Sequence, residues 1–313
     1  MSRLFRDVEG GPLCPQGSVV CIGAFDGLHL GHRALVRHAV ERARALGAPA
    51  VALTFEPLPR EFFAQSEPPP RLTLARAKFE GLRDLGIDVV GLLRFDGRLA
   101  SMTAERFVRD MLVGRLSARE VWIGPDFRFG KGRAGDLALL RTFDAFESHA
   151  IDPILVEGER VSSTRIRGAL TTGDFDTAAR LLGRRYAIDG RVVRGKQLGR
   201  TLGYPTANLR YGRRRPPLQG IFATRVHGLG GAPIDSVSSF GTRPTVAGVE
   251  PLLEAHLFDF DGDLYGRRIS VEFVAHLRDE LTFTDLPAMV EQIHRDARQA
   301  RELLSSLSQQ ACA

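Results

Sequence analysis

The sequence predicts two domains of different fold class: a Rossmann-like α/β domain over residues 1–183, and a small antiparallel β-barrel with a C-terminal helix over residues 184–313. Three observations favour this division. The chain has 313 residues, more than one hydrophobic core usually holds. Up to Gly183, short apolar runs alternate with amphipathic segments, a pattern typical of a parallel sheet. Beyond Gly183, segments of period two are separated by glycine and proline turns.

Five apolar runs in the first half have the length of buried strands. They are SVVCIG (18–23), PAVALTF (49–55), DVVGLLRF (88–95), REVWIG (119–124) and DPILVEG (152–158). Four segments with i, i+3, i+4 spacing are predicted helices: HRALVRHAVERARALG (32–47), RLTLARAKFEGLRDLG (71–86), TAERFVRDMLVGRL (103–116) and GDLALLRTFDAFESHA (135–150). Alternation of this kind predicts a parallel sheet with right-handed crossovers.

The second half contains alternating apolar and polar residues rather than continuous apolar runs. The clearest strands are YAIDGRVVRG (186–195), GIFATRVHG (220–228) and RISVEFVAH (268–276), and a closing helix is expected over 286–307. Antiparallel strands with one buried face have this pattern, so we expect a small barrel.

Composition limits the classes of partner. The net charge is +6, and arginines are interleaved with acids; only RYGRRRPP (210–217) is a basic run, which fits either a solvated loop or a phosphate or nucleic-acid patch. We therefore expect attraction to anions but no nucleic-acid partner. Three scattered cysteines suggest neither disulfides nor a metal cluster, and no apolar stretch or signal-peptide core points to a membrane. These features predict a reducing cytoplasm.

The stretch GAFDGLHLGH (23–32) follows the first predicted strand, at the edge where parallel sheets bind ligands. Gly23, Gly27 and Gly31 allow a sharp turn and a close ligand approach, and a helix beginning near Gly31 offers free N–H groups to phosphate. His29 and His32 lie one helical turn apart and can face one phosphate, where they would stabilise charge as pyrophosphate leaves. Taken alone, the pair also fits a polar surface feature or half of a metal site.

A second segment, VSSTRIRGAL (161–170), follows the last predicted strand of the first half. Ser163 or Thr164 can cap the helix that begins here, and Arg167 would project one turn in, toward the β- and γ-phosphates of a nucleotide. A simple helix cap without a ligand is the alternative.

In the second half, GRVVRGKQLGRTLGYPTANL (190–209) combines glycines with cations. Gly195 and Gly199 suggest a loop over an anion, with Lys196 and Arg200 as counter-charges, although a solvated hairpin has the same composition. In the extended PTAN segment, Thr206 and Asn208 point the same way, so both oxygens can reach one hard cation such as Mg²⁺.

If the cation site above binds a nucleotide whose phosphate is transferred to an alcohol, a further group is needed to orient that alcohol. In LLEAHLFDFDGDLYG (252–266), Leu252, Glu254 and His256 share one face of a strand, so Glu254 can look into a site from a well-anchored element. An exposed strand carboxylate is the alternative.

GAFDGLHLGH and SSTRIR together resemble the nucleotidyltransferase superfamily. TFEPLPREFF (54–63) and IGPDFRFGKGRAGD (123–136) look like its flavin adenylyltransferase branch, and GRTLGYPTAN, SFGTRPTV and HLRDELTF resemble the riboflavin kinase barrel. From about Ser18 to Leu307 the chain is therefore similar to the bifunctional bacterial riboflavin kinase/FAD synthetase family. Two departures stand out: Leu58 replaces the usual His, and Asp126 replaces an Asn of some relatives.

The resemblance implies two ATP-dependent reactions: riboflavin kinase in the barrel, giving FMN, and FMN adenylyltransferase in the first domain, giving FAD. It implies ATP and riboflavin as substrates and Mg²⁺ as cofactor. By carry-over, the catalytic residues are Glu254, His29, His32 and Arg167, and the metal ligands are Thr206 and Asn208. The expected nucleotide-binding residues are Gly23, Phe25, Asp26, Gly27, Gly31, Ser163, Thr164, Gly195, Lys196, Gly199 and Arg200, and the expected flavin-binding residues are Asp126, Phe127 and Arg128.

Two rival interpretations make different predictions. An adenylyltransferase for another acceptor, with a barrel that only senses flavin, is disfavoured by TFEPLPREFF, by DFRFG and by the intact PTAN segment and Glu254. A non-enzymatic flavin- or RNA-binding module predicts loss of His29, His32 or Arg167, and all three are present. We expect a monomer or weak self-association, with no membrane partner.

Overall fold

The computed structural model describes residues 2–195, 199, 202–212, 214–245 and 248–312. Contacts divide the chain into two compact units, and each is described by itself. The first unit comprises Met1–Pro69 and Ala75–Ser163, and the second comprises Pro70–Leu74 and Thr164–Ala313. Among the described residues, no helix is both long and apolar enough to cross a membrane. The predicted domain boundary after residue 183 stays a prediction.

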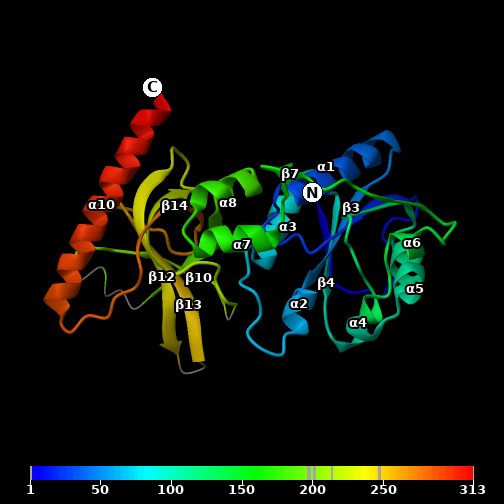
Figure 1. Cartoon of the computed structure of the whole chain (residues 1–313), viewed down its shortest axis with the longest axis horizontal. Helices are drawn as coiled ribbons and strands as arrows, with labels where there is room; N and C mark the ends of the chain where they lie inside the picture. The colour runs from blue at the N-terminus through cyan, green and yellow to red at the C-terminus, as the bar shows by residue number, and fades with distance from the viewer. Residues whose placement is uncertain (1, 196–198, 200–201, 213, 246–247, 313) are drawn as a thin grey trace. The chain divides into compact units, whose positions relative to one another are not determined.

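The first unit is built on a six-stranded parallel sheet in the order β1-β4-β3-β2-β5-β6. Figure 1 labels β3 and β4 of this sheet. Its strands are β1 (Arg3–Phe5), β2 (Ser18–Ile22), β3 (Ala50–Glu56), β4 (Val89–Arg94), β5 (Ala118–Ile123) and β6 (Glu147–Ala150). Four of the five predicted strands are confirmed, because uniformly apolar runs occupy the centre of a sheet that is covered on both faces.

Helices cover both faces of this sheet. They are α1 (Leu30–Ala45), α2 (Pro59–Phe62), α3 (Ala75–Asp84), α4 (Gly97–Ser101), α5 (Ala104–Phe107), η1 (Val108–Arg115), η2 (Lys131–Arg133) and α6 (Leu137–Leu140). Alternate β2 residues face opposite layers: Val19 and Cys21 pack with α1, whereas Val20 and Ile22 pack with η1 and the segments beside it. This period-two division gives the predicted Rossmann-like three-layer arrangement.

Three details of the first unit differ from the predictions. DPILVEG contributes only β7 (Leu155–Val156), which forms a hairpin with β8 (Glu159–Arg160) outside the main sheet. The reason is the turn between them, because Glu157 and Gly158 both have positive φ (58° and 77°), as tight hairpin turns require. GDLALLRTFDAFESHA is helical only over α6, and its end pairs with β5 as β6. In η1 the helix widens, and the Leu116 amide donates to the Met111 carbonyl at 3.1 Å.

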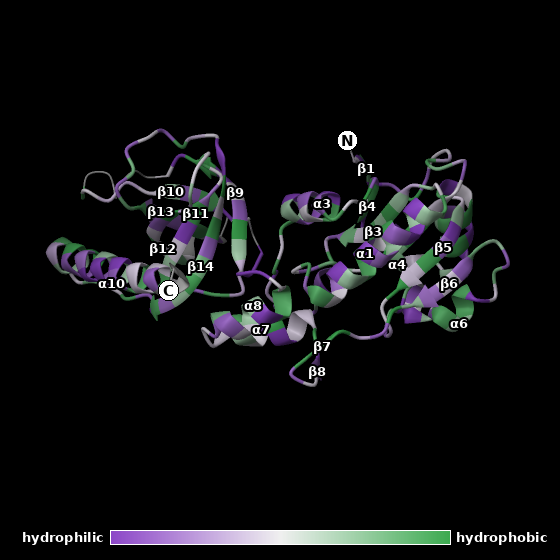
Figure 2. Ribbon diagram, turned by 90° about the horizontal axis from the view of Figure 1, so that it is seen from above, coloured by the Kyte–Doolittle hydropathy of each residue, from purple (hydrophilic) through white to green (hydrophobic). Residues whose placement is uncertain are grey.

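The second unit is a closed antiparallel barrel in the order β10-β13-β12-β11-β14-β9. Its strands are β9 (Ala187–Val193), β10 (Ala207–Arg210), β11 (Gly220–His227), β12 (Ile234–Thr245), β13 (Gly248–Leu257) and β14 (Arg268–Arg278), and its helices are α7 (Ser163–Thr171, which begins one residue before the unit), α8 (Phe175–Leu182) and α10 (Leu286–Cys312). The predicted barrel and closing helix are confirmed. The helix α10 mixes hydrophilic and hydrophobic residues along its length (Figure 2), and Ala297, Ala300 and Leu304 are buried against the barrel.

Candidate active sites

Two histidines meet at the turn between β2 and α1. His29 is the N-cap of α1, and its Nδ1 accepts a hydrogen bond from the His32 amide at 3.3 Å. The two rings stack with centroids 3.6 Å apart and planes inclined by 16°. The predicted pair is thus brought together at the N-terminus of a 16-residue helix, where free amides and the helix dipole favour an anion.

Burial governs the charge of this histidine pair. Desolvation lowers the pKa of His32 well below its usual 6.5, and the neighbouring His29 and Lys78 lower it further. The Nδ1 of His32 is buried and has no hydrogen-bond partner among the described residues. Those residues also contain no group of three His, Cys, Asp or Glu side chains arranged for a metal. His32 is therefore a neutral imidazole near pH 7.

The turn that carries the histidines has an unusual backbone. Gly27 has a positive φ of 92°, as expected, but the other left-handed residues are Phe25 (48°) and Leu28 (46°), not Gly23 and Gly31. Gly23 is needed for a different reason, because a Cβ there would lie 3.1 Å from the Phe25 ring. Left-handed conformations in bulky residues cost about 1 kcal/mol or more each and concentrate at functional sites.

The turn is also tied to the segment that opens α7. Asp26 is 1% exposed, and its carbonyl accepts a hydrogen bond from Ser163 Oγ at 2.8 Å. Ser163 is the first residue of α7, so its hydroxyl anchors the turn instead of capping the helix. Ser163, the last residue of the first unit, therefore fixes the backbone of the histidine turn.

Lys78 is a residue of this site that the sequence reasoning missed. It is fully buried on α3, and its Nζ donates to Thr54 Oγ1 at 3.3 Å. Thr54 Oγ1 in turn donates to the Ala24 carbonyl at 3.0 Å, at the start of the histidine turn. A lysine four residues before the buried Leu82, on the apolar side of a predicted helix, was the signal in the sequence.

Aromatic side chains gather near the C-terminal end of β3. Phe62 and Phe63 are 41% and 60% exposed, and both make edge-to-face contacts with Phe95, at 5.4 and 5.7 Å. Leu58, which starts the short α2, is buried and apolar. Exposed rings at the ligand edge of a sheet can hold a planar aromatic group.

The predicted flavin-binding residues occupy a separate loop of the same unit. The Phe127 ring stacks on Phe129 at 5.8 Å. The two charged residues are already paired: Asp126 with Arg160, and Arg128 Nη1 with Asp136 at 2.6 Å. A flavin contact by either charged side chain would therefore be shared with its ion pair.

Arg167 and Thr164 belong to the second unit and are described there. Arg167 is 8% exposed, and its Nε donates to the Pro70 carbonyl at 2.5 Å. This bond fixes the position of the buried Arg167 guanidinium near the start of α7. Its action together with the two histidines stays a prediction.

In the barrel, the candidate metal ligand and the candidate catalytic carboxylate face each other. Asn208 on β10 lies directly opposite Glu254 on β13 in the antiparallel register. Asn208 Nδ2 donates to the Thr206 carbonyl at 3.1 Å and approaches Thr206 Oγ1 at 3.4 Å. Asn208 Oδ1 is buried and has no hydrogen-bond partner among the described residues. An orphaned oxygen beside a hydroxyl fits Mg²⁺, which prefers oxygen ligands.

The glycines of the preceding segment leave room for this arrangement. A Cβ at Gly195 would lie 2.6 Å from Asn208 Oδ1, so only glycine fits at that position. A Cβ at Gly199 would lie 2.3 Å from the Tyr204 carbonyl, and the Tyr204 amide donates to the Gly199 carbonyl at 2.7 Å. Lys196 and Arg200, predicted to bind nucleotide here, lie outside the described residues.

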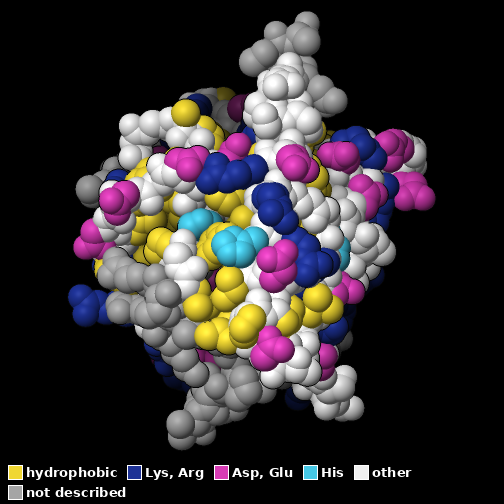
Figure 3. Space-filling view, turned by 90° about the vertical axis from the view of Figure 1, so that its left-hand side faces the viewer, with side chains coloured by type: hydrophobic (Ala, Val, Ile, Leu, Met, Phe, Trp, Pro, Cys, Tyr) yellow, Lys and Arg dark blue, Asp and Glu magenta, His cyan; other side chains and the backbone are white. Residues whose placement is uncertain are grey.

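A cavity of about 480 Å³ adjoins these residues and includes Thr206 and Glu254 in its wall. Its apolar lining comes from Leu202, Ile221, Val237, Leu281, Phe283, Met289 and Ile293. On the face shown in Figure 3, hydrophobic and histidine side chains gather together and are bordered by acidic and basic ones. An apolar cavity with few polar groups suits a planar ring system. Leu202, Leu281 and Phe283 belong to motifs of the kinase resemblance, but no sequence pattern predicted that these residues line one cavity.

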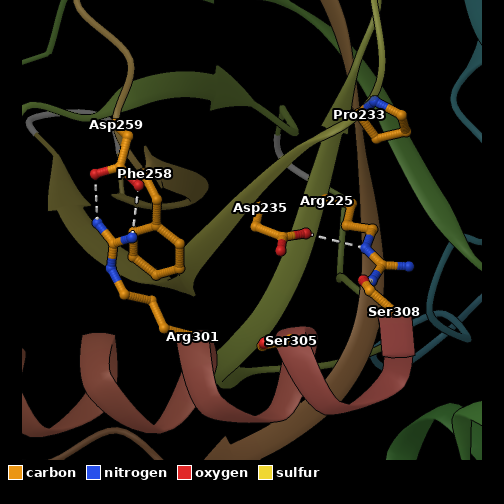
Figure 4. Close-up of a pocket in the computed structure, with 8 residues that line it drawn as sticks. All are labelled: Arg225, Pro233, Asp235, Phe258, Asp259, Arg301, Ser305 and Ser308. Carbon is orange, nitrogen blue, oxygen red and sulfur yellow. Dashed lines mark hydrogen bonds and ion pairs between the residues drawn. The ribbon is translucent and has the colours of Figure 1, made fainter. Parts of the chain in front are cut away.

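A second cavity, of about 520 Å³, lies between α10 and the strands β11 to β13 (Figure 4). Its charges are paired: Arg301 with Asp259 at 2.6 Å, and Arg225 with Asp235 at 3.0 Å. Arg301 also lies over the Phe258 ring at 4.2 Å. Arg301 thus attaches α10 to the residues that follow β13, and Arg225 Nη2, which donates to Ser308 Oγ at 2.8 Å, attaches it to β11.

Comparisons with known proteins assign both halves. A family model described as FAD synthetase matches residues 12–165, and one described as riboflavin kinase matches residues 182–304. Among curated relatives, the bifunctional riboflavin kinase/FMN adenylyltransferase of Escherichia coli K12 is 43% identical, over 96% of this chain and 97% of its own. The proteins of the same name from Pseudomonas fluorescens and Haemophilus influenzae are 44% and 37% identical, over 92% and 97% of this chain and 93% and 100% of their own.

A solved structure shares the fold of the whole chain. It is titled as a macrolide-efflux protein from Streptococcus pneumoniae, is 29% identical, and matches with a TM-score of 0.76. The match covers 96% of this chain and 98% of that one.

Proposed function

Since this chain belongs to the bifunctional riboflavin kinase/FMN adenylyltransferase family, we propose that each domain carries one of the two reactions. The chain phosphorylates riboflavin with ATP to give FMN, and adenylylates FMN with a second ATP to give FAD and pyrophosphate. We assign the first reaction to residues 184–313 and the second to residues 1–183.

The kinase assignment rests on one observation: Asn208, with its unpaired buried Oδ1, lies directly opposite Glu254. Thr206 and Asn208 would hold Mg²⁺, which neutralises charge on the phosphates of ATP when bound. Glu254 orients the ribityl hydroxyl of riboflavin and takes its proton as the γ-phosphoryl group is transferred. The adjoining apolar cavity holds the isoalloxazine ring and excludes water from it.

In the first domain, catalysis is by positioning and charge stabilisation, because the FMN phosphate is itself the nucleophile. It attacks the α-phosphorus of ATP, and pyrophosphate leaves. The neutral His32, the adjacent His29 and the amides that begin α1 donate hydrogen bonds to the phosphate oxygens, and Arg167 binds the leaving phosphates. Phe62, Phe63 and the Phe127 loop hold the flavin ring.

The direct test is to incubate the purified chain with riboflavin, ATP and Mg²⁺ and to separate the flavins by chromatography. Both FMN and FAD are expected. FMN without FAD would refute the assignment of the first domain, and no FMN would refute that of the barrel.

Two substitutions test the residue assignments. We expect Glu254→Gln to lower FMN formation at least about 100-fold while FAD still forms from supplied FMN, because the amide cannot accept the hydroxyl proton. We expect His32→Ala to do the reverse, since it removes a donor to the transition state. Each variant is the control for the other. Unchanged riboflavin phosphorylation by Glu254→Gln would show that Glu254 has another role.

A further inference from the structure

The antiparallel ladder between β10 and β13 ends just before a proposed metal ligand. Its first pair is Ala207 with Ala255, and β10 begins at Ala207. The reason lies two residues earlier, because Pro205 has no N–H and cannot continue the ladder. Thr206 therefore lies between the last ladder pair and a proline, without the cross-strand bonds that fix the rest of β10.

A side chain replaces the missing ladder bond. His256 on β13 approaches the Pro205 carbonyl with its Nδ1 at 2.9 Å. A carbonyl only accepts hydrogen bonds, so Nδ1 carries the proton and donates. Burial lowers the pKa of His256, which makes the neutral form with its hydrogen on Nδ1 the relevant one near pH 7.

The same segment is held from a second direction. The Tyr204 ring lies between two histidine rings, with centroids 4.9 Å from His256 and 5.3 Å from His294 of α10. The Tyr204 hydroxyl is hydrogen-bonded to Nδ1 of His294. Tyr204, Thr206, Glu254 and His256 all line the apolar cavity. The peptide unit before Thr206 is thus attached to the strand that carries Glu254.

We propose that His256 is a positioning residue of the kinase reaction: by donating to the Pro205 carbonyl, it fixes Thr206 and Asn208 relative to Glu254. This inference rests on the proposed function, in which Thr206 and Asn208 bind Mg²⁺. His256 has no role in the chemical step. Its side-chain hydrogen bond takes the place of the ladder hydrogen bond that Pro205 cannot donate.

The test compares His256→Leu, which has similar bulk but no donor, with His256→Asn, whose amide nitrogen takes the place of Nδ1. In the metal-free full chain, amide hydrogen exchange is measured by mass spectrometry over residues 202–210. We expect exchange there to be at least about tenfold faster in His256→Leu and close to wild type in His256→Asn. A purely packing role would make the two variants alike.

The second readout is the Mg²⁺ dependence of FMN formation. Residues that orient metal ligands typically change metal affinity 10- to 100-fold. We expect His256→Leu to raise the half-saturating Mg²⁺ concentration about tenfold, with kcat at saturation changed less than about twofold. FAD formation from supplied FMN should be unchanged in both variants. If His256→Leu changes neither exchange nor Mg²⁺ dependence, or if His256→Asn is as impaired, the inference is wrong.

Asn208→Ala, measured in the same series, separates the proposal that Asn208 binds Mg²⁺ from the proposal that His256 orders the segment. Loss of FMN formation, or a raised Mg²⁺ requirement, supports the metal assignment on which the inference rests. If FMN formation and its Mg²⁺ dependence stay unchanged, the metal assignment fails. The exchange measurement, made without metal, then still decides whether His256 orders the segment.

Discussion

The fold controls the protonation of His32. Burial and the neighbouring His29 and Lys78 hold its pKa well below 6.5. We expect its imidazole ¹³Cε1 resonance to stay at the neutral position from about pH 8 to about pH 6, where an ordinary histidine is already mostly protonated. Nuclear magnetic resonance with ¹³C-labelled histidine checks this, and His32→Gln identifies the signal. A midpoint at or above 6.5 would contradict it.

This suppressed protonation also affects stability. The unfolded chain takes up a proton near pH 6.5 and the folded chain does not, so acid favours unfolding. The contribution of His32 to the unfolding free energy is fully present above pH 6.5. It is lost as the pH falls from 6.5 toward the lower pKa that His32 has in the folded chain. It amounts to at most about 1.4 kcal/mol per pH unit.

Gly195 tests the space around the proposed metal ligand. We expect Gly195→Ala to lower kcat/KM for FMN formation at least about tenfold, because the new Cβ would lie 2.6 Å from Asn208 Oδ1 and must displace it. FAD formation from FMN should not change. Gly231→Ala is the control, since a Cβ there meets nothing within 4 Å. Equal activity of the two variants would show that Asn208 adapts without loss.

At the scale of elements, a buried ion pair attaches α10 to β14. Arg278 of β14 donates to both oxygens of Asp296, at 2.9 and 2.6 Å, and the Asp296 side chain is only 6% exposed. We expect Asp296→Asn to lower the unfolding free energy of the second unit by about 2–3 kcal/mol, because it leaves a partly buried guanidinium unpaired. Urea unfolding followed by circular dichroism measures this change.

A matched control is Asp259, which follows β13 and pairs with an arginine of α10. Asp259 also binds its arginine, Arg301 of α10, through both oxygens, but its side chain is 79% exposed (Figure 4). Asp259→Asn should lower the unfolding free energy less than Asp296→Asn does, because solvent screens an exposed ion pair. The fluorescence of Trp122, in β5 of the first unit, reports whether either change reaches that unit. Similar losses in both variants would mean that burial does not determine the strength of these pairs.

The sequence predicts a strand where every residue of the strand is buried. It does not predict one where only hydrogen bonding to a neighbouring strand makes the segment a strand. β2 is buried at every position, and its apolar run identified it. β6 (ESHA) is a partly exposed edge strand that only its pairing with β5 reveals. Conversely, the apolar Leu155 of DPILVEG is 56% exposed, because a tight turn folds that segment back on itself. A local pattern of apolar residues indicates which residues are buried, but it does not indicate which strand a segment pairs with.

The site residues divide in the same way. The histidine pair and the Thr206–Asn208 spacing were predicted, since a helical turn and a strand repeat place such residues on one side. Lys78, His256 and the apolar cavity lining come together only through tertiary contacts between separate elements. Spacing within one element indicates the face on which Lys78 or His256 lies, but not the groups of other elements that each side chain contacts.

At the scale of the whole molecule, the open question is where the barrel unit begins. The sequence places the boundary after residue 183, but Phe175 of α8 packs on Phe222 and Phe273, at 6.0 and 6.4 Å. We expect a fragment of residues 164–313 to melt roughly 5–10 °C above one of residues 184–313, which lacks this buried ring. Thermal unfolding followed by circular dichroism compares them. Equal melting temperatures would support a barrel that folds from residue 184.

The closed barrel also limits how this protein can change in length. β10 has four residues and is hydrogen-bonded to β9 on one side and to β13 on the other, so it has no free edge along which to slip. One residue gained or lost between Thr206 and Asn208 would turn the Asn208 amide to the opposite face, away from Glu254. The same gain in the turn between β11 and β12 moves neither group. An insertion or deletion should therefore be tolerated in the turn between β11 and β12, while the length of the PTAN segment is fixed.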